Sequence, residues 1–137
     1  GYGLLGSEAN AIEGNKRPLS SMTPTIIFKD DEPFMVFGSP GGSRIITTVL
    51  QVALNVMDHE MNIAQAVHSP RIHHQWLPEV LMIEKGFGPD TQKLLEQKGY
   101  RLYPSSTMGS VQAIMKKGKY FYGSADPRRP SSGVAVP

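Results

Sequence analysis

Cysteine is absent from the 137 residues. Its absence excludes disulfide scaffolds, cysteine zinc sites, iron–sulfur clusters and thiol catalysis. Charge of one sign is also scarce, because 14 basic and 12 acidic residues leave a net charge of only +2. A protein that binds nucleic acid or an anionic membrane surface carries a much larger basic excess, so neither partner is expected. No apolar run approaches the roughly 20 residues of a membrane span.

The beginning of the chain lacks the features of an export signal. Residues 1–6 have no basic flank and no long apolar stretch, so we do not expect an intact signal peptide. The chain also has no initiator methionine. We therefore expect it to begin partway through a longer sequence, either because of processing or because only a piece is present.

Glycine and proline are abundant, with 14 and 11 residues, and predict short elements joined by frequent turns. We expect a single domain over 1–137, with an irregular lead-in at 1–23 and a flexible tail at 128–137. The first two strands and the long helix are apolar at nearly every position, which predicts burial on both faces. The order of elements indicates an α+β, layered αββα domain. The expected strands are 25–29, 34–38, 80–84, 100–103, 110–116 and 119–122, and the expected helices are 44–57 after the N-cap Ser43, 63–67 after the N-cap Asn62, and 89–98 before Gly99.

The segment 38–44, Gly-Ser-Pro-Gly-Gly-Ser-Arg, joins an expected strand to an expected helix. Glycine permits positive φ and brings bare N–H groups close to a ligand, and a helix N-terminus adds free donors. Such a turn suits a phosphate, a carboxylate or a developing oxyanion. A P-loop lysine and a GxGxxG pattern are both missing. A tight strand-to-helix turn without a ligand remains the alternative.

Ser20 and Ser21 lie between two prolines and offer two hydroxyl donors to a carboxylate. The alternative is a loop whose hydroxyls satisfy its own backbone. The four histidines do not form an HExxH motif, and the neighbours His73 and His74 face opposite sides of any strand, so no metal site is expected. The basic residues near the end of the chain, Lys116, Lys117, Lys119, Arg128 and Arg129, are interpreted as a solvated hairpin and tail.

Several of these segments together resemble the bacterial γ-glutamyltranspeptidases, in the C-terminal part of their small subunit. The likeness extends over almost the whole chain in the same order. The segments that carry it are 15–25 (NKRPLSSMTPT), 38–45 (GSPGGSRI), 70–78 (PRIHHQWLP) and 122–128 (YGSADPR).

The resemblance implies an αββα sandwich of the N-terminal-nucleophile hydrolase type, which is incomplete in this chain. It also implies a precursor that cleaves itself into a large and a small subunit. A threonine freed at the start of the small subunit attacks the γ-glutamyl amide of glutathione, and the acyl group passes to water, an amino acid or a peptide. No cofactor is implied.

The resemblance also assigns roles to individual residues. Gly41 and Gly42 match the pair whose N–H groups form the oxyanion hole. Ser20 and Ser21 match the serines that hold the substrate α-carboxylate. The remaining matches are Tyr2, an aromatic residue of the lid loop, and Arg71, an arginine expected to be structural through ion pairs with neighbouring carboxylates.

The segment of the family that carries the nucleophile has no counterpart in these 137 residues. We therefore expect the chain to be catalytically inactive on its own. Two alternatives stay open: a related acylase acting on poly-γ-glutamate or cephalosporin side chains, and a non-catalytic module that binds an anion or an amino acid. Bacterial members of the family are mostly periplasmic or secreted, and the resemblance implies the same here.

Overall fold

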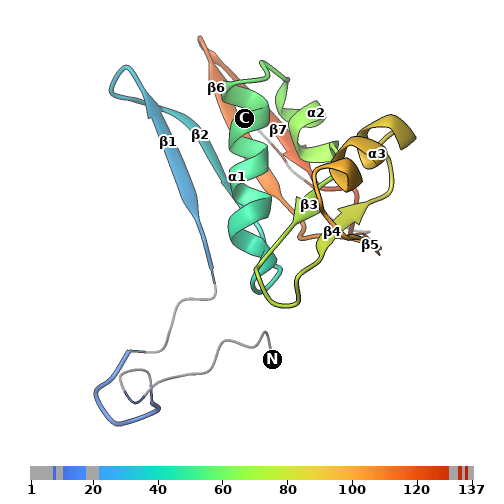
Figure 1. Ribbon diagram of the computed structural model, residues 1–137. Coiled ribbons are helices and arrows are strands. Elements are labelled where there is room, and N and C mark those ends of the chain that lie inside the picture. The colour runs from blue at the N-terminus through green and yellow to red at the C-terminus, as the bar shows by residue number, and fades with distance from the viewer. Residues whose placement is uncertain (1–7, 9–10, 18–21, 130–132, 134, 136–137) are drawn as a thin grey trace.

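The computed structural model describes residues 8, 11–17, 22–129, 133 and 135, and its regular elements form two sheets and three helices. The first sheet has the strand order β1-β2-β6-β7, and the second has the order β3-β4-β5 (Figure 1). The elements are β1 (Thr25–Lys29), β2 (Glu32–Gly38), α1 (Arg44–Met57), α2 (Ile63–His68), β3 (Ile72–His73), β4 (Leu81–Glu84), α3 (Pro89–Gln97), β5 (Leu102–Ser105), β6 (Gln112–Lys117) and β7 (Tyr120–Ala125).

The first sheet is antiparallel throughout and consists of two hairpins joined edge to edge. The β1–β2 turn places Asp30 and Asp31 at φ 53° and 61°, a region that aspartate enters more readily than most residues. The β6–β7 turn contains Gly118 at φ 60°. Both hairpins predicted from the sequence are confirmed.

The hydrophobic core lies between this sheet and the helices α1 and α2, which pack on the same face (Figure 1). Strand alternation turns Met35 and Phe37 of β2 toward the helices, together with Ala113 and Met115 of β6. The helices contribute the matching apolar stripe, formed by Ile45, Val49, Val52, Val56, Ile63, Ala66 and Val67.

The opposite face of the first sheet is exposed, so the prediction of burial on both faces is wrong for the described chain. Ile26, Val36 and Ile114 are directly paired across β1, β2 and β6 and form an exposed apolar row. Helix α1 likewise buries one side and exposes Ile46 (68%) and Leu50 (52%). The physical reason is that the described elements supply one layer of helices, which covers only one face of the sheet.

The second sheet forms a small unit beside α1 (Figure 1). Strand β3 is antiparallel to β4, and β4 is parallel to β5 through a crossover that contains α3. Gly99 has φ 92° directly after the C-cap of α3, which confirms it as the residue that ends the helix. The N-cap predicted for α2 is confirmed as well, because Asn62 and Gln65 form a capping box.

Substitutions at two neighbouring positions of β2 distinguish its two faces. Met35 is 1% exposed and packs in the core, whereas Val36 is 48% exposed on the open face. In the 137-residue chain we expect Met35→Ala to cost about 2–5 kcal/mol of unfolding free energy, since it opens a cavity. Val36→Ala is expected to cost less than about 1 kcal/mol, because little packing is lost. Urea unfolding followed by circular dichroism measures both, and equal losses would contradict this assignment of the faces.

Candidate functional site: the Gly41–Gly42 turn

The turn between β2 and α1 exposes two consecutive glycines in conformations that other residues rarely adopt. Gly41 has φ 148° and Gly42 has φ 60°, and both residues are exposed. Within the described part of the chain, neither amide N–H donates to a protein acceptor. Pro40, which precedes them, has no N–H to offer. Among the described residues, the turn therefore has two backbone donors without a protein acceptor.

The loop that leads into β6 holds one end of this turn in place. Ser39 Oγ accepts a 2.9 Å hydrogen bond from the Ser110 amide and donates at 2.8 Å to the Pro40 carbonyl. Glycine is favoured at position 109, because its φ is 72° and a Cβ there would lie 2.5 Å from Ser39 Oγ. A Cβ on Gly41 would lie 3.4 Å from the Cα of Gly109. The two backbones thus approach each other closely.

A helix N-terminus and the side chains of three arginines border the turn. The carbonyls of Gly41 and Gly42 accept from the first amides of α1, so the turn lies at the N-terminal, positive end of a 14-residue helix. A pocket of about 310 Å³ adjoins it. Its lining is formed by Gly41, Arg44, Thr107, Gly109, Arg128 and Arg129. Backbone donors, a helix N-terminus and guanidinium groups together suit an anion or a developing oxyanion.

The remaining residues assigned to substrate by the resemblance cannot be placed next to this turn. Tyr2, Ser20 and Ser21 lie outside the described residues. The same applies to most of the predicted lead-in and tail. Of the site predicted from the sequence, the structure therefore describes the glycine turn and Arg71.

Arg71 forms the ion pair that the resemblance implies, and the pair is fully buried. Its Nη2 donates to Asp126 Oδ2 at 2.8 Å, with the two side chains 2% and 0% exposed. Arg71 also donates to the carbonyls of Val67 and Met108, at 2.7 and 2.6 Å. Its Nε is the one buried side-chain polar atom without a partner among the described residues.

Arg128 belongs to the same buried ion-pair cluster, together with Asp126 and Glu84. The prediction that a solvated tail begins at 128 is therefore wrong for this residue. Its guanidinium contacts Glu84 through Nε at 2.9 Å and through Nη2 at 2.5 Å. It also lies 3.1 Å from Asp126 Oδ1. Asp126 and Arg128 are two positions apart, and such a pair near a chain end is a weak sequence signal. The pairing with Glu84 crosses 44 positions and has no local signature.

The two carboxylates of this ion-pair cluster also bind backbone amides. Asp126 Oδ2 accepts from the Val111 amide at 2.8 Å, and Glu84 Oε1 accepts from the Met108 amide at 2.6 Å. Burial alone would raise the pKa of Asp126. The Val111 and Arg128 amides and the Arg71 guanidinium outweigh it and hold the pKa below the ordinary value. The cluster thus fixes both ends of the 108–111 segment that holds Ser39.

Two of the histidines, His73 and His74, make packing and hydrogen-bonding contacts in the described structure. His73 is 3% exposed, with Nδ1 2.7 Å from Thr47 Oγ1 and Nε2 2.9 Å from Gln75 Oε1. His74 is exposed and faces the Tyr100 ring edge-on. Within the described ranges, no three His, Asp or Glu side chains are grouped so as to hold a metal ion.

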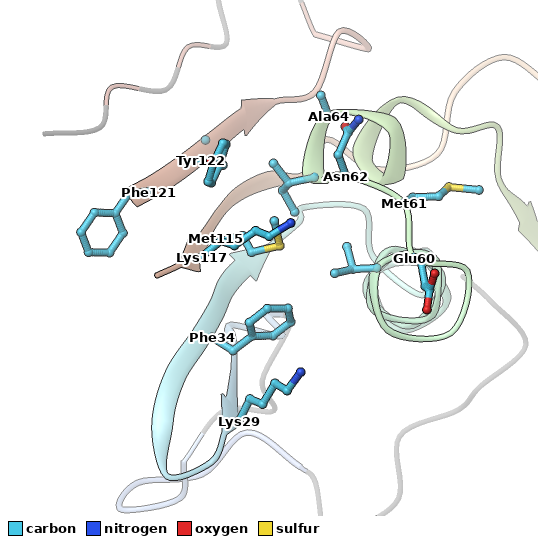
Figure 2. Close-up of a pocket in the computed structure, with 13 residues that line it drawn as sticks. Lys29, Phe34, Glu60, Met61, Asn62, Ala64, Met115, Lys117, Phe121 and Tyr122 are labelled. Carbon is cyan, nitrogen blue, oxygen red and sulfur yellow. The ribbon is translucent and has the colours of Figure 1, made fainter. Parts of the chain in front are cut away.

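A larger pocket, of about 790 Å³, lies elsewhere in the molecule (Figure 2). It opens between the end of α1, the start of α2 and the two hairpins, and its lining includes Phe34, Met61, Met115 and Tyr122. None of its lining residues belongs to the glycine turn. It is therefore separate from the candidate site.

Comparison with known proteins identifies the family. The model of the family described as Gamma-glutamyltranspeptidase matches residues 1–136. The chain belongs to the γ-glutamyltranspeptidase family. The glutathione hydrolase proenzyme of Escherichia coli K12 is 57% identical over 129 residues, which cover 93% of this chain and 22% of that protein. The glutathione hydrolase proenzyme of Bacillus subtilis 168 is 39% identical over 131 residues, again 93% of this chain and 22% of the relative.

The solved structures agree with the family and its N-terminal-nucleophile hydrolase fold. A mutant of Helicobacter pylori γ-glutamyltranspeptidase superposes with a TM-score of 0.86 and 57% identity, covering 93% of this chain and 72% of that chain. The Bacillus anthracis transpeptidase CapD, with a TM-score of 0.75 at 23% identity, shares the fold. The chain spans about a quarter or less of the length of the curated γ-glutamyltranspeptidase relatives. None of the helices in the described ranges combines the length and apolar character needed to cross a bilayer.

The buried Asp126 makes the stability of the protein sensitive to acid. Because its pKa is lower in the folded than in the unfolded state, its stabilisation is present above the unfolded value of about 3.9 and is lost as pH falls through the folded value. Asp126→Asn removes the carboxylate that pairs with Arg71 and leaves Glu84 to balance two buried guanidinium groups, which we expect to cost about 3–5 kcal/mol at pH 7. The variant should also lose less stability than the wild type between pH 5 and pH 2.

The matched control is Glu32→Gln, which removes the exposed Glu32–Lys116 pair on the first sheet. We expect it to leave the thermal melting temperature at pH 7 nearly unchanged, because water screens an exposed pair. Thermal melts of both variants from pH 2 to 8 provide the comparison. Equal shifts for the two variants would contradict the dominant role of the buried cluster.

Proposed function

We propose that the chain is the C-terminal part of the small subunit of a γ-glutamyl acyltransferase and hydrolase that acts on glutathione and related γ-glutamyl amides. The single observation that carries the proposal is the pair of N–H donors at Gly41 and Gly42 that no described residue accepts, in a chain 57% identical to a glutathione hydrolase proenzyme. The proposed acceptors of the acyl group are water, amino acids and peptides. No cofactor takes part in the proposed reaction.

The turn would serve the chemistry as an oxyanion hole. When a hydroxyl attacks the γ-glutamyl amide, the carbonyl oxygen gains negative charge. Donors that are already fixed in place stabilise that charge without reorganising. Gly41 and Gly42 have such donors, and the anchoring of Ser39 to Ser110 keeps their backbone in position. The dipole of α1 adds to the effect.

The nucleophile would come from the part of the precursor outside these 137 residues. In the proposed mechanism, a threonine freed by self-cleavage attacks, with its own α-amine as the base. The large subunit of the same precursor would complete the structure. The proposed location is periplasmic or secreted, and it rests on the family resemblance.

Sequence identity distinguishes the proposal from its nearest alternative. The adjacent hydroxyls of Ser20 and Ser21 suit the free α-carboxylate of a γ-glutamyl group, and a glutathione hydrolase proenzyme is 57% identical to this chain. The likeness to a cephalosporin acylase from Bacillus halodurans, at 24% identity and a TM-score of 0.72, concerns the fold alone. We therefore favour γ-glutamyl substrates over cephalosporins.

Replacing both serines tests the carboxylate-binding role in the complete enzyme. Each hydrogen bond to a charged group contributes roughly 1.5–3 kcal/mol. We expect the double variant Ser20→Ala and Ser21→Ala to lower kcat/KM for a γ-glutamyl anilide at least tenfold. The rate of chromophore release measures the loss. Wild-type kcat/KM in the double variant would show that the serines do not hold the substrate.

A substitution at Gly42 tests the oxyanion hole. A β-branched residue disfavours φ near 60°, so valine would rotate the peptide and turn the donors away from the substrate. We expect Gly42→Val to lower kcat at least a hundredfold, the range found when one oxyanion donor is lost. Steady-state kinetics on purified mature enzyme give the value.

Gly118 provides the matched control. It has the same φ of 60°, lies in the β6–β7 turn, and has open space around the position of a Cβ. Gly118→Val therefore imposes a comparable backbone strain far from the glycine turn. We expect its kcat to stay within about twofold of the wild type. If Gly42→Val remained folded and kept more than a tenth of normal kcat, the turn would be only a connector.

A further inference from the structure

The hydroxyl of Ser43 points away from the helix that this residue begins. Ser43 is the N-cap of α1, as the sequence predicts, but its side chain makes no capping hydrogen bond. The hydroxyl donates instead to Gln75 Oε1, at 2.7 Å and across 32 positions of the chain. A serine N-cap ordinarily accepts from the first turn of its helix. Here that stabilisation is replaced by a tertiary contact directly after Gly42.

Gln75 is held in the orientation that this contact needs. Its Nε2 donates to the Leu77 carbonyl at 2.8 Å, which fixes the direction of the amide. Its Oε1 then faces both Ser43 Oγ and His73 Nε2, the latter at 2.9 Å. A carbonyl oxygen only accepts, so His73 carries its proton on Nε2. The other ring nitrogen of His73, Nδ1, lies 2.7 Å from the Thr47 hydroxyl, which is also 3.2 Å from the Arg44 carbonyl.

These hydrogen bonds close a ring between the start of α1 and two residues at the end of β3, His73 within the strand and Gln75 just after it. Ser43 and Thr47 lie one turn apart on α1, and each is tied to the pair formed by His73 and Gln75. His73 is buried, so its bonds are protected from competing water. The ring leaves Ser43 little freedom to move relative to β3.

The position of Ser43 constrains the backbone that carries the glycine donors. The Gly42 N–H lies in the Gly41–Gly42 peptide plane, which is joined to the Gly42–Ser43 peptide plane only by the φ and ψ rotations at the Gly42 Cα, so a displacement of Ser43 that changes φ also turns the Gly42 donor. Glycine itself offers no side chain to resist such a rotation. Ser39 is anchored by Ser110 on the other side of the turn. Gln75 thus anchors the second end of a segment that is otherwise free to twist.

We propose that Gln75, oriented by His73, is a positioning residue that fixes the Gly41–Gly42 amides through the hydroxyl of Ser43. The proposal rests on the proposed function for its effect on catalysis, but its geometric part stands on the hydrogen bonds alone. Gln75 itself does not contact the substrate in this scheme. Its loss should therefore lower kcat and leave KM nearly unchanged.

The kinetic test uses the complete, mature enzyme and a γ-glutamyl anilide. We expect Gln75→Leu to lower kcat about tenfold when the rate is normalised to the concentration of mature enzyme, and to leave KM within about twofold of the wild type. The loss is smaller than for removal of a donor because the donors are displaced but still present. Gln75→Glu keeps an oxygen that accepts from Ser43 and His73 but loses the bond from Nε2 to the Leu77 carbonyl, so its kcat should lie between that of Gln75→Leu and that of the wild type. A Gln75→Leu enzyme with wild-type kcat, or Gln75→Glu as slow as Gln75→Leu, would overturn the proposal.

A double-mutant cycle shows whether the effect passes through Ser43. If Ser43→Ala and Gln75→Leu break the same hydrogen bond, the double variant should be no more than about twofold slower than the slower single variant. If the fold-loss in kcat of the double variant equalled the product of the two single losses, the two residues would act separately, and the proposed path through Ser43 would be contradicted.

The matched control is Gln51→Leu. Gln51 also bridges α1 and β3, through bonds to the Thr47 and Ile72 carbonyls and to the Ile72 amide, but it does not contact Ser43. We expect this variant to lower the melting temperature at least as much as Gln75→Leu does, with kcat within threefold of the wild type. An equal loss of kcat in both variants would mean that Gln75 acts only through stability.

Hydrogen exchange separates failure of this proposal from failure of the proposed function. In the complete protein, Gln75→Leu should increase deuterium uptake in the peptide that covers 38–46, and Gln51→Leu should not. If the wild-type enzyme failed to turn over the anilide, the proposed function would be wrong, and exchange would still decide the positioning. Unchanged uptake in Gln75→Leu would overturn the positioning role.

Discussion

The buried ion pair between Arg71 and Asp126 is the interaction on which the rest of the described structure depends. Arg71 directly precedes β3 in the second sheet, and Asp126 directly follows β7 in the first. Their contact therefore fastens one sheet to the other. Desolvating two charges is costly, and only a full set of partners offsets it. Here the backbone supplies most of them, because Asp126 accepts from the Val111 and Arg128 amides in addition to Arg71.

The same ion pair reaches the glycine turn through one intermediate segment. The amides of Met108 and Val111 are bound by Glu84 and Asp126, so the loop between them is fixed at both ends. Ser110 in that loop donates to Ser39, which begins the turn. The structural role of Arg71 is thus more than packing. The buried carboxylates of Glu84 and Asp126 hold the 108–111 loop in place, and this loop in turn holds the glycine turn through Ser39.

Local chemistry explains which parts of this arrangement could be predicted from the sequence. The capping box of Asn62 and Gln65, and the left-handed Gly99 after α3, depend on neighbouring residues and were predictable. The apolar character of Val36 and Ile46 was visible too, but it predicted burial that the described chain does not provide. The sequence shows that these side chains are apolar, but it does not show whether another layer covers them. Among the described elements no such layer is present.

The missed features all depend on pairs far apart along the chain. The contact between Arg128 and Glu84 spans 44 positions, and that between Ser43 and Gln75 spans 32. No periodicity or spacing rule identifies such partners. The case of Ser43 is the more instructive, because local rules placed it correctly at the N-cap and would assign its hydroxyl to the helix. The tertiary bond to Gln75 replaced the local one.

The glycine turn combines two demands that oppose each other. Free N–H groups and positive φ require glycine, which also permits the backbone to rotate. A fixed donor geometry requires that rotation to be stopped. The described structure meets both demands by leaving Gly41 and Gly42 bare and anchoring the residues on either side of Pro40-Gly41-Gly42 to different parts of the fold. Ser39 is tied to the loop before β6, and Ser43 to the segment after β3. Rigidity at the turn is therefore supplied by its flanks, and its two glycines remain open to a ligand.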